Sequence, residues 1–415
     1  MKQQIQSLKG FRDILPEDAK KREWLKNRLI EIFELWGYVP LETPTLEPLE
    51  LFEGEIGEEE KLFFKFKDSG GRDVALRYDQ TVPACRAVGN YYNEFVMPFK
   101  RYQIQPAYRA EKPQKGRYRE FLQCDADIFG VKSPYADAET IALSLDIYRR
   151  LGFKQACVYI NDRALMKDIP YKAIVCIDKL DKVGEDGVIE EMVKRGIEKE
   201  KANEYFDYAK NIKPNETIKI ILRYLRDCGF DDGWYKFDPT IARSFSYSDG
   251  PIWEVKIPEY GNSSVLGGER YDGLATKLSG REMSGTGFGL GFDRTLEAMD
   301  ALSLFPDIEI AEDVLVVSFS ENEFSYATQM GNVLREAGVS VSVYPQPGEK
   351  LAKQFKYANR KNIPWVIVIG EDEVTKGMVT LKSMESGEQM TIDMDAAIEK
   401  ILSCMACSSE DCARM

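Results

Sequence analysis

The hydrophobic and polar positions of this chain show both helical and strand-like periodicity. Residues 16–36 place Leu25, Leu29 and Phe33 at helical spacing and are followed by Gly37, which predicts an amphipathic helix that ends there. The stretches "KLFFKFKDSGGRDVALRYD" and "FKRYQIQPAYRAEKPQKGRYREFLQCDADIFG" each hold two strand-like segments around a glycine-containing turn, which predicts two β-hairpins. Helices before and between such hairpins indicate an antiparallel sheet backed by helices, an α+β fold.

The rest of the chain changes pattern twice. Residues 171–231 are charge-dense and helix-like with little strand signal, which is typical of an inserted module, and strand-like segments return at "PIWEVKI". Further on, "DVLVVSF", "VSVSVYP" and "WVIVIG" alternate with helical segments, which predicts a small α/β domain with a largely parallel sheet. The predicted domains are residues 1–165 and 234–311 as two parts of one α+β domain, 166–233 as a helical insertion, 312–402 as the α/β domain, and 403–415 as a frayed tail.

Composition narrows the chemistry. The 415 residues include no histidine, which excludes a Ser-His-Asp triad, a histidine general base and a zinc site with histidine ligands. The remaining side chains suit phosphoryl-type chemistry, in which positioning and charge neutralisation dominate. No metal ligands are predicted. The scattered cysteines and the lack of a signal peptide or a long apolar run predict a cytoplasmic protein without membrane contact.

A local cluster of cations interrupts a chain whose formal net charge is -13. The cluster consists of Arg109, Lys112, Lys115, Arg117 and Arg119. Strand geometry places Arg109 with Glu111, and Arg117 with Phe121, on one face, where guanidinium groups could grip phosphate and the ring could stack on a base. Spacing alone also fits a solvated hairpin with cross-strand Arg–Glu pairs. The glycine-rich run "GTGFGLGFDR" likewise fits a closely packed strand as well as a binding loop.

Several ordered segments resemble the histidyl-tRNA synthetase family of class II aminoacyl-tRNA synthetases. "YVPLETPTLEP" resembles motif 1, "YRAEKPQKGRYREFLQCDADIFG" resembles motif 2 and "GFGLGFDR" resembles motif 3. "LGGERYDGL" and "FDPTIARSFSYSDGPIWEV" are similar to two stretches peculiar to histidyl enzymes, and the likeness runs from about Lys9 to Ile401. The resemblance implies a class II antiparallel sheet flanked by helices, a helical insertion, a C-terminal α/β anticodon-binding domain and a homodimer.

The resemblance also implies a reaction. The family attaches histidine to its tRNA through a histidyl-adenylate, using ATP and Mg²⁺, and contacts the acceptor end and the anticodon of the tRNA. Two other interpretations stay open. One is a catalytically idle paralogue, such as the regulatory subunit of ATP phosphoribosyltransferase or an RNA-binding sensor. The other is a synthetase whose amino-acid specificity has changed.

Individual residues acquire roles from the same resemblance. Arg109 and Arg243 would face the α-phosphate of ATP from opposite sides and neutralise the charge that builds there. The ATP-binding set is Arg109, Glu111, Arg117, Phe121 and Arg294. The amino-acid-binding set is Asp79, Thr81, Gln123, Asp127, Arg243, Tyr247, Ser248 and Tyr271, with Asp127 on an imidazole nitrogen. The tRNA-binding set is Lys112, Gln114 and Lys115.

The sequence departs from the family pattern near the amino-acid pocket. The usual "RGLDYY" is "RSFSYS" here, so Ser248 replaces a tyrosine whose hydroxyl ordinarily reaches the imidazole. Glu269 replaces a third glycine in "GGERYD", and Asp293 replaces a glutamate in motif 3. Three explanations for Ser248 stay open: a bridging water, a neighbouring hydroxyl from Tyr247 or Tyr271, or a different amino-acid substrate.

Overall fold

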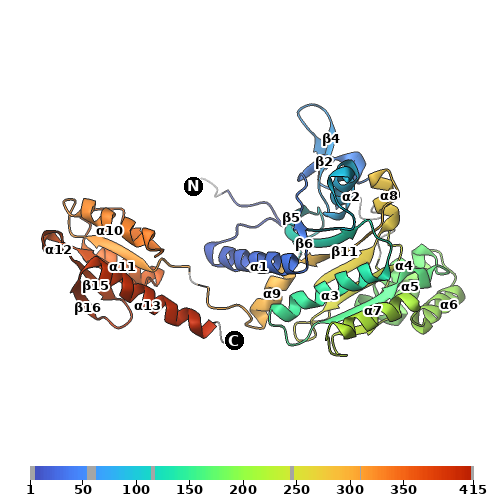
Figure 1. The fold of residues 1–415 in the computed structure, drawn as a ribbon. Coiled ribbons are helices and arrows are strands. Elements are labelled where there is room, and N and C mark those ends of the chain that lie inside the picture. Colours follow the sequence, from blue (N-terminus) through green and yellow to red (C-terminus); the bar gives the residue numbers. More distant parts are fainter. Residues whose placement is uncertain (1–4, 54–61, 114–116, 244–246, 309, 413–415) are drawn as a thin grey trace. The chain divides into compact units, whose positions relative to one another are not determined.

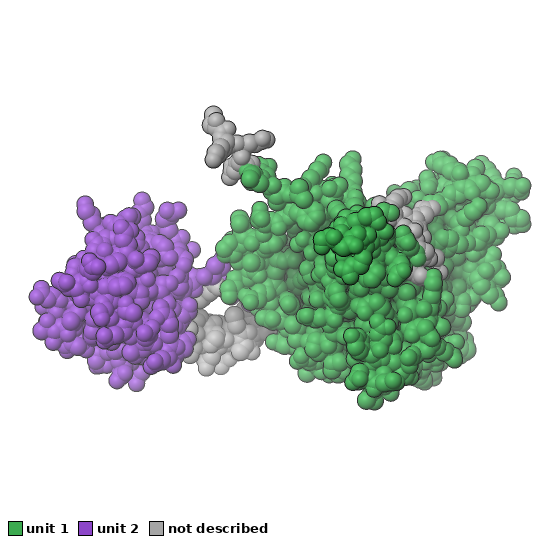
Figure 2. All heavy atoms as spheres, turned by 90° about the horizontal axis from the view of Figure 1, so that it is seen from above, with its two compact units in different colours: residues 1–305 green, residues 306–415 purple. Residues whose placement is uncertain are grey.

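The structure, a computed structural model, describes residues 5–53, 62–113, 117–243, 247–308 and 310–412, with residues 405–412 described by their backbone alone. The chain forms two compact units, Met1–Phe305 and Pro306–Met415, which Figure 2 colours separately. The finer division into residues 1–165, 166–233 and 234–311 stays a prediction.

Eight strands form the central sheet of the first unit (Figure 1). They are β1 (Val39–Pro40), β5 (Phe99–Tyr108), β6 (Glu120–Phe129), β7 (Cys157–Asp162), β8 (Tyr235–Phe237), β9 (Pro251–Lys256), β10 (Leu266–Arg270) and β11 (Gly285–Gly291). Their order is β1-β5-β6-β11-β10-β9-β7-β8. Only the outermost pairs, β1 with β5 and β7 with β8, are parallel among these strands. The predicted α+β fold with an antiparallel sheet is confirmed.

Alternating side chains give the two faces of this sheet different characters. On β11, Phe288 and Leu290 are buried in the main hydrophobic core, while Gly287 and Gly289 alternate with them and face the other side. Four helices contribute buried residues to the core, namely α1 (Pro16–Leu35), α3 (Pro134–Arg150), α7 (Glu216–Asp227) and α9 (Phe292–Ala301). The core face is therefore covered by helices, and the glycine face is left for the site.

The first helix forms where the sequence predicts it. Helix α1 begins at Pro16, whose fixed φ suits a first helical position. The negative charges of Glu17 and Asp18 in its first turn interact favourably with the positive end of the helix dipole. After the helix, Gly37 adopts a φ of 75°, a left-handed conformation that glycine takes without steric cost.

A smaller sheet lies before the long hairpin in sequence. Its strands are β2 (Leu46–Pro48), β3 (Lys65–Lys67) and β4 (Asp73–Leu76), in the order β2-β4-β3. The neighbouring short elements are η1 (Leu49–Leu51), α2 (Thr81–Asn90), η3 (Tyr92–Glu94) and α8 (Asp272–Ser279). Both predicted hairpins, β3–β4 and β5–β6, are antiparallel pairs and are confirmed.

The predicted insertion is helical, as expected. It contains η4 (Arg163–Met166), α4 (Tyr171–Ile177), α5 (Leu180–Lys194), α6 (Lys199–Asn211) and α7. Helices α4 to α6 build a hydrophobic cluster of their own, with Ile174, Val188 and Phe206 buried in it. Helix α7 instead contributes Ile218, Ile221 and Leu225 to the main core.

The second unit contains a mixed sheet. Its elements are β12 (Val314–Ser318), α10 (Phe324–Glu336), β13 (Val341–Val343), α11 (Leu351–Lys361), β14 (Trp365–Ile369), α12 (Glu371–Lys376), β15 (Val379–Ser383), β16 (Gln389–Ile392) and α13 (Met394–Cys412). Strands β13-β12-β14 are parallel, as predicted, but β15 and β16 join them antiparallel.

Two predictions for this unit are therefore corrected. The sheet is not largely parallel, because β15 and β16 are joined by a short turn that can only reverse the chain. The backbone of the expected frayed tail, residues 403–415, continues α13 as far as Cys412. Within the described part of the chain, no helix has the length and hydropathy needed to cross a membrane.

Candidate active site

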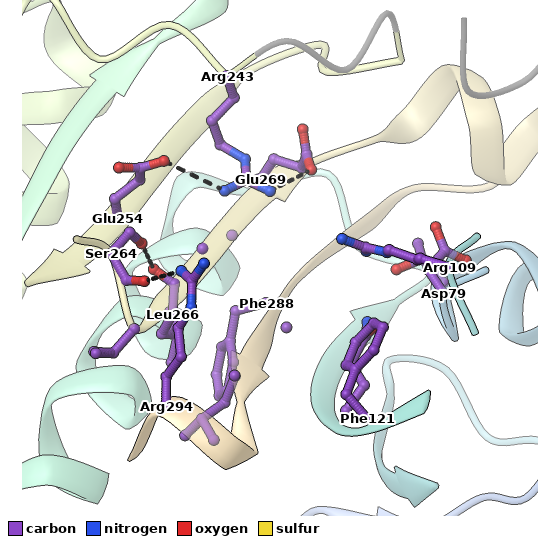
Figure 3. A pocket seen from close by; sticks show the side chains of 18 of the residues that line it. Asp79, Arg109, Phe121, Arg243, Glu254, Ser264, Leu266, Glu269, Phe288 and Arg294 are labelled. Atoms are coloured by element: carbon purple, nitrogen blue, oxygen red, sulfur yellow. Dashed lines mark hydrogen bonds and ion pairs between the residues drawn. The ribbon is translucent and has the colours of Figure 1, made fainter. Parts of the chain in front are cut away.

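A cavity of about 540 Å³ lies against the glycine face of the central sheet (Figure 3). Residues from several separate segments of the first unit, between Leu62 and Arg294, line it. They include the predicted site residues Asp79, Thr81, Arg109, Glu111, Arg117, Phe121, Gln123, Asp127, Arg243, Tyr247, Tyr271 and Arg294. Two predicted residues, Lys112 and Ser248, are not among the lining residues, and Gln114 and Lys115 lie outside the described residues.

Glycines form the floor of this cavity because charged groups lie directly on them. A Cβ atom on Gly267 would lie 1.9 Å from Nη1 of Arg243, and one on Gly287 would lie 2.1 Å from Oδ1 of Asp127. On the opposite face, a Cβ atom on Gly268 would lie 2.2 Å from the ring of Trp253. The glycine-rich runs therefore serve both functions that the sequence left open, close packing on one face and a binding floor on the other.

Arg109 follows the end of β5 and points into the cavity (Figure 3). Its guanidinium carbon lies 4.2 Å from the ring centroid of Tyr78 and 5.1 Å from that of Phe121. Its Nε donates a hydrogen bond of 3.4 Å to the carbonyl of Tyr78. Aromatic faces and a carbonyl thus orient this cation without neutralising it.

Arg243 reaches the same cavity from the segment between β8 and β9. Its Nη2 lies 3.3 Å from Glu269 and its Nη1 lies 3.9 Å from Glu254. Burial opposes the charge, but the two carboxylates outweigh it and raise the pKa of the guanidinium. The backbone φ of 40° is unusual for a residue with a side chain and costs about 1–2 kcal/mol. Tertiary structure therefore brings the two predicted catalytic arginines into one cavity, and it holds the backbone of Arg243 in a strained conformation to do so.

Three guanidinium groups crowd the other end of the cavity. Burial lowers the pKa of Arg294, and the neighbouring charges of Arg117 and Arg109 lower it further. Arg294 lies in the first turn of helix α9 and donates a 2.6 Å hydrogen bond to the carbonyl of Ser264. Glu111 lies 3.3 Å from Arg117 and offsets part of the charge. The mutual repulsion of these cations favours a polyanionic ligand between them.

Two acids at the predicted amino-acid end are buried. Burial raises the pKa of Asp79 to about 6, against the opposing effects of the Val82 amide and Arg109. Burial also raises the pKa of Asp127, although Arg101 and the Tyr271 hydroxyl oppose the shift. Tyr271 donates a short hydrogen bond to Oδ1 of Asp127.

Arg101, which the sequence did not point to, contacts the predicted site residue Asp127. It is fully buried on β5 directly opposite Asp127, and its Nη2 lies 2.5 Å from Oδ2 of that acid. Its Nη1 also donates a 3.0 Å hydrogen bond to Oε1 of Gln103. The available signal was the polar alternation of Arg101, Gln103 and Gln105 along one face of a buried strand.

Glu269 is the second residue whose role was not predicted. It lies on the cavity wall and is 6% exposed. Its Oε1 accepts a hydrogen bond from Arg243, and its Oε2 accepts a short one from Ser248. Ser248 therefore contacts a residue of the cavity wall through Glu269, although it does not line the cavity itself.

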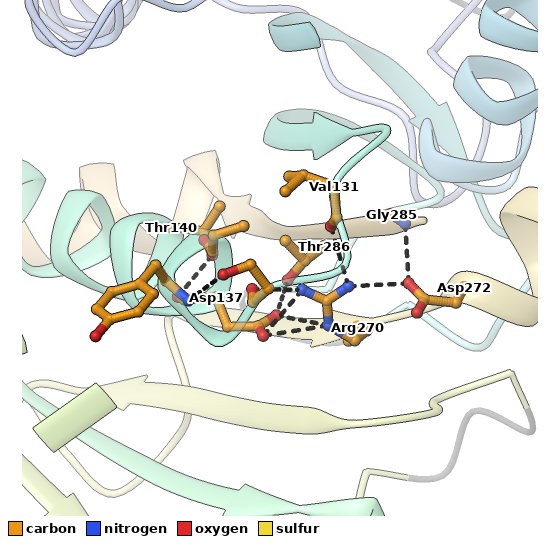
Figure 4. Close-up of polar contacts among 10 residues, drawn as sticks. Val131, Asp137, Thr140, Arg270, Asp272, Gly285 and Thr286 are labelled. Carbon is orange, nitrogen blue, oxygen red and sulfur yellow. Dashed lines mark hydrogen bonds and ion pairs between the residues drawn. The ribbon is translucent and has the colours of Figure 1, made fainter. Parts of the chain in front are cut away.

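Arg270, the next residue on β10, serves the opposite face of the sheet (Figure 4). It donates to Asp137 of α3 at 2.9 and 3.0 Å, to Asp272 at 3.0 Å and to the carbonyl of Ser133 at 3.1 Å. The Thr286 hydroxyl donates a further 2.6 Å hydrogen bond to Asp137. This cluster fixes β10 against α3, so that its neighbour Glu269 is directed to the cavity.

Asp293 connects motif 3 to the N-terminal region. It accepts a 2.8 Å hydrogen bond from Arg12, a short one from Arg22 and one of 3.4 Å from the amide of Leu122. The carboxylate that replaces the family's glutamate thus holds α1, β6 and α9 together beside the cavity.

Comparisons with known proteins agree with this architecture. A family model described as "Histidyl-tRNA synthetase" matches residues 10–183, and one described as "Anticodon binding domain" matches residues 313–403. The histidine–tRNA ligase of Cytophaga hutchinsonii is 35% identical, over 95% of this chain and 98% of its own length. That of Wolinella succinogenes is 37% identical, again over 95% and 98%.

Solved structures give the same result. Histidyl-tRNA synthetase from Nostoc sp. PCC 7120 has a TM-score of 0.79 at 25% identity and covers 97% of this chain and 100% of its own. The apo enzyme of S. aureus has a TM-score of 0.75 at 28% identity, covering 96% and 100%. A Bacillus halodurans protein described as an ATP phosphoribosyltransferase regulatory subunit/histidyl-tRNA synthetase shares the fold, with a TM-score of 0.68 at 23% identity, covering 87% and 97%. Because it is 35–37% identical to two histidine–tRNA ligases over nearly its whole length, and because its own motifs agree, the chain belongs to the histidyl-tRNA synthetase family.

Proposed function

We propose that this protein attaches histidine to its tRNA in two steps, through a histidyl-adenylate. The observation that carries the proposal is the meeting of Arg109 and Arg243 in one cavity large enough for ATP and an amino acid. No histidine side chain of the protein is needed, because both steps depend on charge neutralisation and positioning.

In the first step, a carboxylate oxygen of histidine attacks the α-phosphorus of ATP and pyrophosphate leaves. Two anions must approach each other, and negative charge builds on the phosphoryl oxygens. Arg109 and Arg243 neutralise that charge without proton transfer. Arg117 and Arg294 bind the β- and γ-phosphates, and Phe121 stacks on the adenine, whose edge lies at Glu111.

Amino-acid binding uses the acidic end of the cavity. Asp79 and Thr81 hold the ammonium group, Gln123 orients the carboxylate, and Asp127 with Tyr271 binds the imidazole. Tyr247 completes the wall, and Ser248 acts through Glu269. In the second step, a ribose hydroxyl of the tRNA attacks the carbonyl carbon of the adenylate and AMP leaves.

Mg²⁺ enters this proposal with the nucleotide. Among the described residues, no group of three or more acidic or thiol side chains is arranged to hold a metal ion. We infer that the ion would enter with ATP as part of the substrate and would supply further charge neutralisation.

The remaining partners follow from the family. We infer that the second unit binds the anticodon, that Lys112, Gln114 and Lys115 contact the acceptor end, and that the protein is a cytoplasmic homodimer. The match of residues 313–403 to an anticodon-binding domain supports the first of these inferences.

The deciding experiment is ATP–pyrophosphate exchange with each of the common amino acids, followed by aminoacylation of tRNA. Exchange that depends on histidine, and transfer to the histidine tRNA, is the expected outcome. Exchange with no amino acid would instead identify an idle paralogue, and exchange with a different amino acid would identify a synthetase of changed specificity.

A further inference from the structure

One row of residues crosses the central sheet at the amino-acid end of the cavity. Cross-strand pairing aligns Glu269 of β10 with Gly287 of β11, Gly287 with Asp127 of β6, and Asp127 with Arg101 of β5. Directly opposed residues on neighbouring strands share a face. Two carboxylates therefore flank a glycine on the cavity side of the sheet, and all three line the cavity.

The glycine between the carboxylates leaves a slot. Neighbouring strands lie about 4.8 Å apart, so the backbones of Glu269 and Asp127 are separated by roughly 10 Å. The carboxylate of Asp127 leans over Gly287, where any side chain would collide with it. The separation of the two backbones is on the scale of a flat five-membered ring with an N–H···O bond of about 2.9 Å at each end.

Internal contacts fix both acids as hydrogen-bond acceptors. Oδ1 of Asp127 accepts from the Tyr271 hydroxyl and Oδ2 pairs with Arg101, while Oε1 of Glu269 accepts from Arg243 and Oε2 accepts from Ser248. Tyr271, Ser248 and Arg243 donate hydrogen bonds to these carboxylates, and Arg101 supplies an opposite charge. A carboxylate has about four acceptor positions, so each acid retains capacity toward the slot.

We propose that Glu269 is a specificity-determining residue that acts together with Asp127 on the other side of Gly287. The two acids select an amino-acid side chain that can donate an N–H at both ends. For histidine, this side chain is the protonated imidazolium. A neutral imidazole has one N–H and one lone pair, and the lone pair would face a carboxylate. This inference rests on the proposed function, because it assigns the substrate form to the same site.

A simpler role for Glu269 would be to neutralise Arg243. Glu254 offers the matched comparison, because it lies 3.9 Å from the same Arg243 guanidinium. It is on β9, paired with Gly267 of β10, and therefore lies one row away from the slot. Loss of either acid changes the environment of Arg243. Only Glu269 also forms a wall of the slot.

The test compares histidine with 2-fluorohistidine, whose ring has nearly the same shape but stays unprotonated at neutral pH. The ratio of kcat/KM in ATP–pyrophosphate exchange is measured for the wild-type protein, Glu269→Gln and Glu254→Gln. Because a charge-assisted hydrogen bond is about twice as strong as a neutral one, we expect the wild-type ratio to favour histidine by about tenfold or more. Glu269→Gln should bring the ratio to within about threefold of one, whereas Glu254→Gln should lower both rates and keep the ratio.

Calorimetric binding of the two amino acids gives the same ratio if Glu269→Gln is too slow for exchange, and a thermal melt checks its folding. Equal use of both amino acids by the wild-type protein would overturn the slot while leaving the proposed function intact. Activation of lysine or arginine instead of histidine, lost in Glu269→Gln, would support the slot and overturn the proposed substrate. If no amino acid with a cationic side chain is activated or bound, both proposals fail.

Discussion

Two arginines beside strand β10 show how one kind of ion pair serves two purposes. Arg270 lies on the α3 face and donates to Asp137, Asp272 and the Ser133 carbonyl, with the donor–acceptor distances near 3 Å. Arg243 lies on the cavity face, 3.3 and 3.9 Å from its carboxylates. The first guanidinium is enclosed by the fold, whereas the second borders a space that a ligand can enter. The chemistry of the ion pair alone does not separate an arginine enclosed by the fold from one that a ligand can reach; the surrounding space does.

Removing the enclosed arginine should have the largest effect, and on stability. Arg270→Met leaves Asp137 buried without its partner, which typically costs about 3–5 kcal/mol. We expect a large fall in the midpoint of thermal unfolding. The double variant Arg270→Met/Asp137→Leu, which removes both charges, should regain part of the loss. A single variant that melts like the wild-type protein would contradict the structural role.

Removing the cavity arginine should affect catalysis instead. Arg243→Ala removes a group that we propose stabilises charge in the transition state, and the loss of such a group typically lowers a rate by about 10²–10³-fold. Pyrophosphate exchange measures the rate, and the thermal midpoint should stay close to that of the wild-type protein. Arg243→Lys keeps the positive charge but lacks the two-pronged guanidinium, so its exchange rate should lie between those of the wild-type protein and Arg243→Ala. An unchanged exchange rate in Arg243→Ala would remove the role proposed for it.

The two units of the chain can likewise be compared, by asking which of the two reactions depends on the second unit. Residues 314–401 contain hydrophobic clusters of their own, so the second unit can be removed without opening the core of the first. Deletion of residues 306–415 should lower tRNA charging by about tenfold or more, a typical loss when one part of a two-part binding surface is removed. Amino-acid activation should change much less, provided that sedimentation shows an unchanged oligomeric state. Parallel losses in both reactions would contradict an anticodon-binding role.

Asp79 gives the smallest effect and one that depends on pH. Its folded-state pKa of about 6 lies above the usual 3.8, so the stabilisation from its protonated form is complete below pH 3.8 and is lost as the pH rises through 6. Asp79→Asn should therefore melt a few degrees higher than wild type at pH 7.5, and the gap should close near pH 4.

The carboxylate form of Asp79 is also the form proposed to bind the ammonium group of the substrate. In the wild-type protein, KM for the amino acid should therefore rise as the pH falls below about 6. Asp79→Asn should show a raised KM at pH 7.5 and little further change toward acid. A pH-independent KM in the wild-type protein would argue against this contact.

Much of the fold was predictable because it depends on local patterns. Helix α1, both hairpins and the alternating elements of the second unit are visible in the spacing of apolar residues and in turn residues. The antiparallel strands β15 and β16 were not predicted, because each is short and carries only two apolar residues, too few for a clear strand pattern.

The site was predictable only where a motif carried it. Arg109, Phe121 and Arg294 lie in recognisable segments, and all three line the cavity. The polar alternation around Arg101 does not identify its partner, Glu269 has no local signal of its role, and Ser248 was expected in the pocket but contacts Glu269 instead. Their roles depend on which strands are neighbours.

The sequence by itself determined the elements, the family and the residue types that could perform the chemistry, since helices and hairpins form from contacts between residues close in the chain. Tertiary structure alone decided that Arg109 and Arg243 share a cavity, that Arg270 does not line it, and that Glu269 and Asp127 lie on either side of Gly287 in one row of the sheet. The reason is that cross-strand register and the side from which a segment crosses a sheet are properties of the assembled core. Residues far apart in the chain become neighbours only when that core forms.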